Sequence, residues 1–308
     1  MRLAAPKSLI RTPIFTGVDF LNMGIKKIIL SADSSCDLGD ALKNRYNVHY
    51  TRFHILLDER SYIDGVNLSA SDIFSTYQQK RCLPKTAAIS VSEYYEHFKR
   101  WTDQGFEVVH INISSAVSST YHNCCLAASE LTGVYPIDSK NLTIGMGMLV
   151  IEAAKRIEQG ISAKEIQSEI TALANKVQTG FVLDSLEFLC AGGRCSALAA
   201  MGANVLKLKP YLEVDTATGT MSLVKKYRGA LDKVLFQFVD EKLASAASSI
   251  NTERVFIPST MQSPELVEAV REHVIGLGLF KEVHVAEVSC TISAHCGPNA
   301  LGLVFLQK

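Results

Sequence analysis

Apolar strand patterns alternate with amphipathic helix patterns over the first half of the chain, and this alternation constrains the fold more than any other feature. The expected strands are residues 26–32, 48–57, 107–113 and 134–137. The expected helices are residues 37–46, 71–80, 90–104 and 146–159. Neighbouring parallel strands need a long crossover connection, which is usually a helix. The sequence therefore predicts an α/β fold with a doubly wound, mostly parallel sheet.

The second half of the chain has a different pattern, with long helices between less regular strands and a hairpin turn at residues 216–220. The expected helices there are residues 186–194, 230–247 and 264–277. The expected strands are residues 209–214, 221–227, 254–259, 283–288 and 300–306. We therefore expect a mixed α+β second domain, with a ligand bound between the two domains. The expected boundaries are residues 1–24 for a flexible N-terminal extension, 25–177 for the first domain and 178–308 for the second.

Length and charge exclude several classes of protein. A chain of 308 residues is comfortable for two domains. Basic and acidic residues balance at 31 each, so no long-range field favours nucleic acid. No stretch approaches the roughly 20 apolar residues that span a bilayer, and Pro6 and Pro13 interrupt the basic N-terminal segment, which argues against a secretory signal. We expect a cytoplasmic protein with no nucleic-acid partner and no stable membrane insertion.

The eight cysteines show no CxxC pair and no recurring Cys/His spacing. The sequence therefore indicates neither a metal site nor a redox dithiol. In a chain of this size, reduced and buried thiols are expected rather than disulfides.

Polar pairs follow three of the expected parallel strands. They are Asp33-Ser34, Ser114-Ser115 and Asp138-Ser139. Ligands of open α/β sheets bind beyond the carboxyl ends of the strands, so this convergence favours a binding site. Two further hydroxyls and a late histidine add neutral hydrogen-bond donors, namely Thr86, Ser118 and His295. Such a set suits one carboxylate, but it is not by itself a catalytic apparatus.

Five short motifs, in order, resemble those of the DegV family of bacterial fatty-acid-binding proteins. They are Asp33-Ser34-Ser35, Lys85-Thr86, SSAVSSTY at residues 114–121, GGRCS at residues 192–196 and HCGPNA at residues 295–300. Each string is weak alone, but five in the family's order are specific. The resemblance runs essentially from residue 26 to the end of the chain.

The motifs also depart from the family pattern. Residues 87–89 read Ala-Ala-Ile where the family has Ser-Gln-Pro. Ser119 and Asn299 replace glycines, and Cys195 replaces an isoleucine. A lost proline and lost glycines change the allowed backbone, and this bears on loop shape and acyl-chain preference.

The resemblance implies a non-catalytic protein that binds a long-chain fatty acid such as palmitate, stearate or oleate, without a cofactor or metal. It implies that Thr86 and Ser118 hold the carboxylate, with His295 nearby. The supporting loop residues would be Ser114, Ser115, Ser119, Asp33 and Ser34. Relatives present the bound acid to a separate fatty acid kinase, which makes an acyl phosphate. Arg194 is the candidate contact with that partner or with phosphate.

An acyl chain requires an apolar tunnel, and its burial would set the affinity. Each buried methylene contributes roughly 0.8 kcal/mol, so a sixteen-carbon tail offers on the order of 10 kcal/mol before ordering costs. Candidate walls are Met146, Met148, Leu149, Ile151 and residues 197–208. An ordinary protein core explains these residues equally well.

Other interpretations of the same residues stay open. Thr86 is also suited to starting a helix, Ser118 to capping one, and His295 to a satisfied core position. A serine hydrolase would combine Ser114, Ser115 or Ser118 with His295 and either Asp33 or Asp138, although no GxSxG motif is present. A phosphate-binding or phosphotransfer role would use the helix start after the 114–118 loop, although no nucleotide fingerprint accompanies it.

Overall fold

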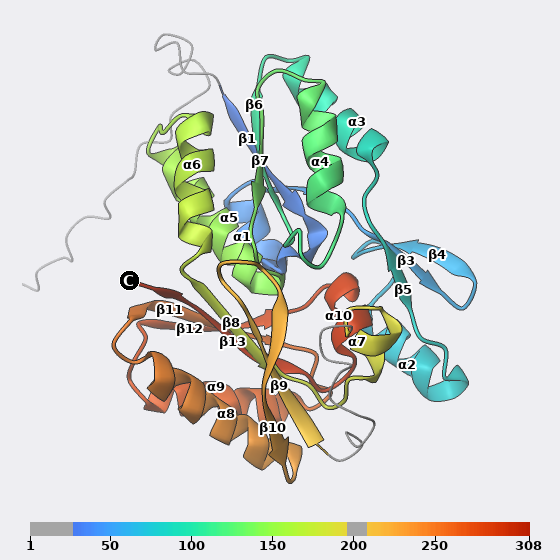
Figure 1. Ribbon diagram of the computed structural model, residues 1–308, viewed down its shortest axis with the longest axis vertical. Helices are drawn as coiled ribbons and strands as arrows, with labels where there is room; N and C mark the ends of the chain where they lie inside the picture. Colours follow the sequence, from blue (N-terminus) through green and yellow to red (C-terminus); the bar gives the residue numbers. More distant parts are fainter. Residues whose placement is uncertain (1–26, 196–207) are drawn as a thin grey trace, which may run out of the picture.

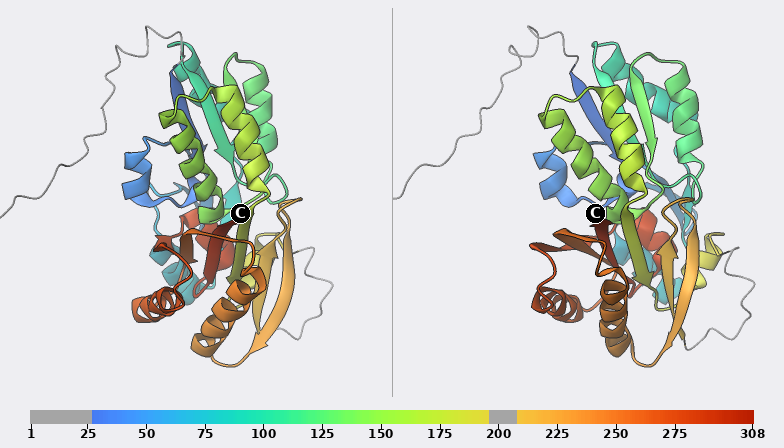
Figure 2. Two further views of the ribbon diagram at one scale, coloured as in Figure 1. Left: turned by 90° about the vertical axis from the view of Figure 1, so that its left-hand side faces the viewer. Right: turned by 60° about the vertical axis from the view of Figure 1, so that its left-hand side comes forward.

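The computed structural model describes residues 27–195 and 208–308 (Figure 1). The expected N-terminal extension and residues 197–207 of the expected tunnel wall lie outside the described residues. Two large sheets lie at opposite ends of the long axis of the molecule (Figures 1 and 2).

The first large sheet is parallel, as the alternation of strands and helices predicts. Its order is β2 (His49–Thr51), β1 (Ile28–Asp33), β6 (Glu107–Asn112) and β7 (Val134–Asp138). Only the first residue of β1 and of β6 is not buried, because helices cover both faces of the sheet. Ala32 pairs with Ile111 and Asn112 with Asp138, so the carboxyl ends of β1, β6 and β7 lie together.

Five helices flank this sheet, on the two sides seen in Figure 1. One side has α1 (Gly39–Arg45), α5 (Thr143–Glu158) and α6 (Ala163–Ala174), and the other has α3 (Val91–Thr102) and α4 (Thr120–Ser129). The two capping boxes of the sequence are confirmed, with Ser90 and Glu93 at the start of α3 and Ser162 and Glu165 at the start of α6.

The second large sheet has six strands and is mixed. Its order is β10 (Met221–Arg228), β9 (Leu208–Val214), β8 (Val177–Val182), β13 (Leu301–Gln307), β11 (Ile250–Ser259) and β12 (Glu282–Glu287). Only β11 and β12 pair in parallel. One face packs on α8 (Leu231–Ala246) and α9 (Pro264–Gly276). The opposite face contributes Phe181 and Val304 to the main core shared with the first sheet.

A third, small sheet was not expected from the sequence. It consists of β4 (Arg60–Ile63), β3 (His54–Leu57) and β5 (Lys85–Ala87), all antiparallel. The predicted single strand at residues 48–57 is therefore wrong, because β2 joins the parallel sheet while β3 pairs within the small one. The apolar pattern continues through both strands, so it cannot reveal a change of pairing partner.

Three short helices lie beside the small sheet. They are α2 (Ala70–Lys80), α7 (Glu187–Ala191) and α10 (Cys290–Cys296), with the turn η1 (Ser34–Cys36) after β1. The sequence predicts α7 as longer than it is and does not predict α10. Helix α10 begins where the Ser289 side chain accepts a hydrogen bond from the backbone N–H of Ile292. Its seven residues are too few for a clear helical period.

The expectation that all cysteines are reduced is wrong for one pair. Cys190 and Cys195 form a disulfide five residues apart in the chain. The other cysteines are free in the part of the chain that the structure describes. The spacing of this pair gave no signal, because the two cysteines meet only through the turn at Gly192 and Gly193 that reverses the chain after α7.

Candidate functional site

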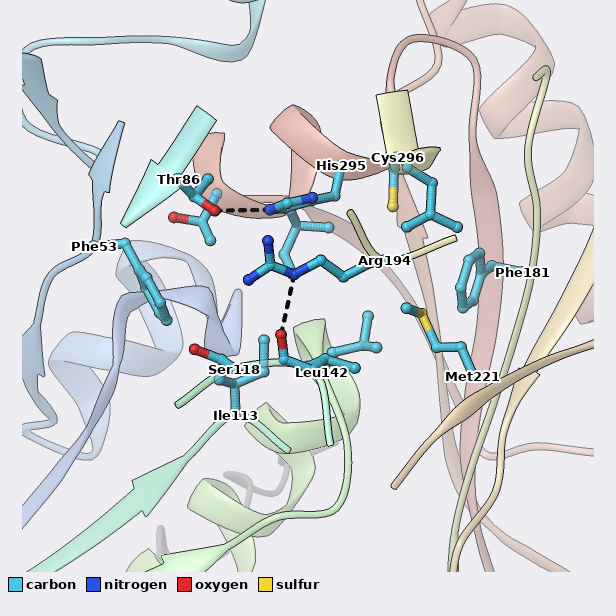
Figure 3. A pocket seen from close by; sticks show the side chains of 14 residues that line it. Phe53, Thr86, Ile113, Ser118, Leu142, Phe181, Arg194, Met221, His295 and Cys296 are labelled. Carbon is cyan, nitrogen blue, oxygen red and sulfur yellow. Dashed lines mark hydrogen bonds between the residues drawn. The ribbon is translucent and has the colours of Figure 1, made fainter. Parts of the chain in front are cut away.

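A small, mostly apolar cavity of about 50 Å³ lies where β5, the loop after β6, the turn after α7, and α10 meet (Figure 3). Five polar side chains line it, namely Thr86, Ser118, Arg194, Thr291 and His295. The apolar lining consists of Phe53, Ile113, Val117, Leu142, Phe181, Leu189, Met221, Ile292 and Cys296. The site thus draws on both halves of the chain.

Thr86 and His295 form the polar contact at one side of this cavity. Oγ1 of Thr86 lies 2.8 Å from Nε2 of His295. Strand β5 places Thr86 opposite Ile55 of β3, and α10 carries His295 against the small sheet. The structure therefore places Thr86 on a strand rather than at the start of a helix.

Burial keeps His295 neutral. It lowers the pKa of His295 from 6.5 to about 4, and the positive charge of Arg194 acts in the same direction. Nδ1 of His295 is buried and has no hydrogen-bond partner among the described residues. Gly192 lies against this nitrogen, and a Cβ added there would be 2.2 Å from Nδ1. We therefore assign the single ring proton to Nε2, where it is donated to Oγ1 of Thr86.

Ser118 faces the cavity from the loop before α4. Its Oγ accepts hydrogen bonds from the backbone N–H of Thr120 at 3.3 Å and from Oγ1 of Thr120 at 3.2 Å. The hydroxyl of Ser118 thus bonds the first residue of α4, although the N-cap residue of that helix is Ser119. Its own proton has no acceptor among the described residues, so it can still be donated into the cavity.

The side chain of Arg194 extends across the cavity, between Ser118 and the Thr86–His295 pair (Figure 3). Its Nε donates to the backbone carbonyl of Val117 at 3.1 Å, and Nη1 donates to the carbonyl of Gly192 at 2.6 Å. The positive φ of 75° at Gly193 confirms the tight turn that the Gly-Gly pair predicts. This turn directs the Arg194 side chain inward rather than to the surface.

The remaining predicted residues of the serine loop do not line the cavity. Ser114 is buried and its hydroxyl donates to the carbonyl of Gly219, which ties the loop to the β9–β10 turn. Ser115 is exposed and donates to Oδ2 of Asp138 at 2.5 Å. Ser119 is exposed at the N-cap position of α4 without a side-chain cap bond.

Asp33 and Ser34 belong to buried networks behind the site. The carboxylate of Asp33 accepts hydrogen bonds from Tyr94 and from the backbone N–H of Ile113, and it contacts His110 at 3.2 Å. Ser34 donates to Asp64 at 2.6 Å. Asp33 therefore supports the cavity through Ile113 without reaching it.

The hydrolase interpretation requires a carboxylate at the histidine of the triad, and His295 has none there among the described residues. Nδ1 of His295, where a triad needs its carboxylate, has no partner among residues 27–195 and 208–308. Asp33 binds other groups, and Asp138 accepts hydrogen bonds from Ser115 and from the backbone N–H of Lys140. The described residues do not assemble a Ser-His-Asp triad.

The apolar lining was largely missed by sequence reasoning. The predicted walls Met146, Met148, Leu149 and Ile151 are buried in the main core and are not among the residues that line this cavity. Helix α5 contacts strands of both large sheets, which explains the burial of these four residues. The true lining comes from separate elements, so no local pattern could have identified it.

Among residues 27–195 and 208–308, no group of three or more His, Cys, Asp or Glu side chains is placed to hold a metal ion. Within the same ranges, no helix combines the length and the apolar character needed to cross a bilayer.

Fold and site define a class: an α/β protein of two large sheets, with an apolar cavity whose few polar groups gather on one side. The family model described as "Uncharacterised protein, DegV family" matches residues 27–308. The chain belongs to the DegV family.

Curated relatives match over nearly their full length. A DegV domain-containing protein of Clostridium perfringens is 28% identical over 284 residues, which cover 92% of this chain and 99% of the relative. A second, from Clostridium acetobutylicum, is 29% identical over 290 residues, covering 92% of this chain and 100% of the relative.

Solved structures of the family share the fold. A fatty-acid-binding DegV family protein from Thermus thermophilus superposes with a TM-score of 0.84 at 26% identity, covering 92% of this chain and 100% of that one. A stearic acid-binding protein from Eubacterium ventriosum gives a TM-score of 0.79 at 25% identity, covering 92% and 98%. Fatty-acid binding thus occurs in members of this family.

Proposed function

We propose that this chain binds one long-chain fatty acid in the cavity described above, with the carboxylate held by Thr86 and Ser118 near His295. The observation that carries the proposal is that these three residues, expected from separate motifs, line one mostly apolar cavity. The Thermus thermophilus and Eubacterium ventriosum relatives support the ligand class.

The hydrogen-bond directions favour an anionic head group. With the proton of His295 on Nε2, Oγ1 of Thr86 acts as acceptor toward the ring and its own proton is free for a ligand oxygen. The Ser118 proton is free in the same way. Two hydroxyl donors and the nearby guanidinium of Arg194 thus complement a carboxylate, since hydrogen bonds to charged groups are the strong ones.

The cavity must enlarge to admit the tail. At about 50 Å³ it has room for only a few water molecules, far less than a sixteen-carbon chain needs. The apolar walls, from Phe53 to Cys296, provide the surface against which the tail would be buried. Because the Arg194 side chain lies across this space, its movement is the expected first step of ligand uptake.

We further propose that the protein does not transform the acid but presents it to a fatty acid kinase, which forms an acyl phosphate. Arg194 lies next to the proposed carboxylate position and is the candidate contact for the incoming phosphoryl group. The proposed location of this encounter is the cytoplasm. An unchanged rate of phosphorylation of the acid bound to the Arg194→Ala variant would contradict this role.

Native mass spectrometry of the freshly purified protein, followed by lipid extraction, tests the binding proposal. We expect one fatty acid per chain, lost in the Thr86→Ala/Ser118→Ala double variant. A ligand-free protein that also fails to take up palmitate or oleate would overturn the proposal and favour the phosphate-binding alternative.

A further inference from the structure

The disulfide between Cys190 and Cys195 encloses the turn that carries Arg194. Cys190 is exposed at the end of α7, whereas Cys195 is buried. Their Cα atoms are 4.5 Å apart, so bond formation needs no large rearrangement of the backbone. Thiol–disulfide exchange begins with the attack of a thiolate on one sulfur, and the exposed Cys190 is the half of this bond that lies at the surface.

The enclosed turn contacts two segments that contribute to the polar lining of the cavity. Gly192 lies against Nδ1 of His295. Arg194 bridges from the turn to the carbonyl of Val117, in the same loop as Ser118. A change in the position of this turn would therefore affect the whole proposed carboxylate site.

The buried half of the bond is Cys195. An apolar residue at this buried position would serve packing alone. The sulfur adds a covalent link to α7.

We propose that Cys190 and Cys195 form a thiol–disulfide exchange site, and that its redox state sets how firmly Arg194 is held across the cavity. The first part of this inference stands on the disulfide alone. The second part, the effect on ligand exchange, rests on the proposed fatty-acid function.

The exchange requires a dithiol reductant. One thiolate of the reductant attacks Sγ of the exposed Cys190, the S–S bond breaks, and the Cys195 thiolate leaves and takes up a proton. The second thiol of the reductant then attacks the mixed disulfide and releases Cys190 as a thiol. The protein gains two electrons and two protons in total, and the reductant becomes a disulfide. A low-molecular-weight disulfide reverses both steps.

Reduction leaves the turn to be held by non-covalent contacts. Within the turn, Gly193 donates its backbone N–H to Cys190 and Arg194 donates to Leu189. These bonds extend α7 but do not replace the covalent link at Cys195. We expect the reduced turn to open locally more often, releasing Arg194 from Val117.

The other thiols near the cavity compete poorly for this chemistry. Burial raises the pKa of Cys296 and of Cys36 to about 12, and that of Cys290 to about 11, so these thiols stay protonated. Cys82 is partly exposed and free, which makes Cys82→Ser the matched control for a surface thiol outside the turn.

The exchange site is tested without any ligand. The protein is incubated with oxidised glutathione or with dithiothreitol, alkylated with iodoacetamide and analysed by peptide mass spectrometry. We expect Cys190 and Cys195 to be alkylated only after reduction, and trypsin to cleave after Arg194 several-fold faster in the reduced protein. Alkylation of both cysteines in the glutathione-treated protein would overturn the site.

Ligand exchange is measured on the same two preparations as the dissociation rate of cis-parinaric acid. We expect several-fold faster release from the reduced protein, no difference between preparations for Cys195→Ile, and the full difference for Cys82→Ser. Equal rates in the two wild-type preparations would overturn the coupling. If neither preparation binds the acid, the proposed function fails and the coupling with it, while the alkylation and trypsin results still decide the exchange site.

Discussion

Nε2 of His295 lies 2.8 Å from Oγ1 of Thr86, although 209 residues separate them in the chain. Strand β5 and the short helix α10 make this contact, and neither was expected as such from the sequence. With the ring proton assigned to Nε2, the threonine proton is free to face the cavity. The contact therefore brings the hydroxyl of Thr86 and the imidazole of His295, from distant parts of the chain, to the same side of the cavity.

Removing either hydroxyl donor should weaken fatty-acid binding. A hydrogen bond to a charged group contributes about 1.5–3 kcal/mol, so Thr86→Val or Ser118→Ala should each weaken palmitate binding by about 10- to 150-fold. A fluorescence displacement titration measures this. Ser119→Ala removes an exposed hydroxyl from the same loop and is expected to bind palmitate like the wild type. Wild-type affinity in both donor variants would contradict the assigned site.

His295 should make the free energy of unfolding depend on pH. Its pKa is lowered to about 4 in the folded protein against 6.5 in the unfolded chain, so only the unfolded state takes up a proton between these values. The free energy of unfolding is therefore not reduced by His295 above pH 6.5, and it falls as the pH drops from 6.5 toward 4. In the His295→Gln variant, the free energy of unfolding should depend less steeply on pH, by up to about 1.4 kcal/mol per pH unit.

Urea unfolding at several pH values between 4.5 and 6.5 provides the measurement for His295. The exposed His122 is the control, and His122→Gln is expected to follow the wild-type curve. A His295→Gln curve parallel to the wild type would show that His295 titrates normally in the folded protein.

Asp37 should act in the opposite direction. Burial raises the pKa of Asp37 to about 7, although the hydrogen bonds from Thr143 and Ser289 act to lower it. Between about pH 4 and 7 the folded state keeps a proton that the unfolded chain has released, so stability falls as the pH rises. Relative to the wild type, the free energy of unfolding of Asp37→Asn should rise by up to about 1.4 kcal/mol per pH unit from pH 5 to 7. Unfolding of the exposed-site control Asp40→Asn should show no such gain.

Gly192 should tolerate no side chain. A Cβ there would lie 2.2 Å from Nδ1 of His295 and 2.5 Å from Cε1, so the ring would have to shift, which disturbs its contact with Thr86. We expect Gly192→Ala to lower the free energy of unfolding by about 1–3 kcal/mol, as overpacking does, and to weaken palmitate binding. Gly276, in α9, has open space around it, and Gly276→Ala is the control. A stable Gly192→Ala variant with normal binding would contradict this close contact.

Local patterns identified much of the fold. The buried runs at β1 and β6 and the capping boxes at Ser90 and Ser162 depend on neighbours within a few residues, so the sequence reveals them directly. The division of residues 48–57 between two sheets depends on pairing with distant strands. No property of those ten residues specifies which strands they pair with.

The same distinction applies to the site. Thr86, Ser118, Arg194 and His295 were selected by short motifs, and the structure gathers them around one cavity. Asp33 and Ser34 were selected by the same reasoning, yet they lie in buried networks behind it. The carboxyl end of a parallel strand predicts where a site lies, but the direction of each side chain depends on the elements packed above it.

The sequence by itself determined the layered α/β architecture and pointed to Thr86, Ser118, Arg194 and His295, because periodicity, caps and short motifs act over a few residues. Only the tertiary structure decided that Gly192 lies against His295, that Cys190 pairs with Cys195 and that Phe181 and Met221 face the same space. These contacts join segments through chain reversals and sheet packing. They arise when several elements bury their apolar faces together, so they cannot be predicted from the sequence of any single segment.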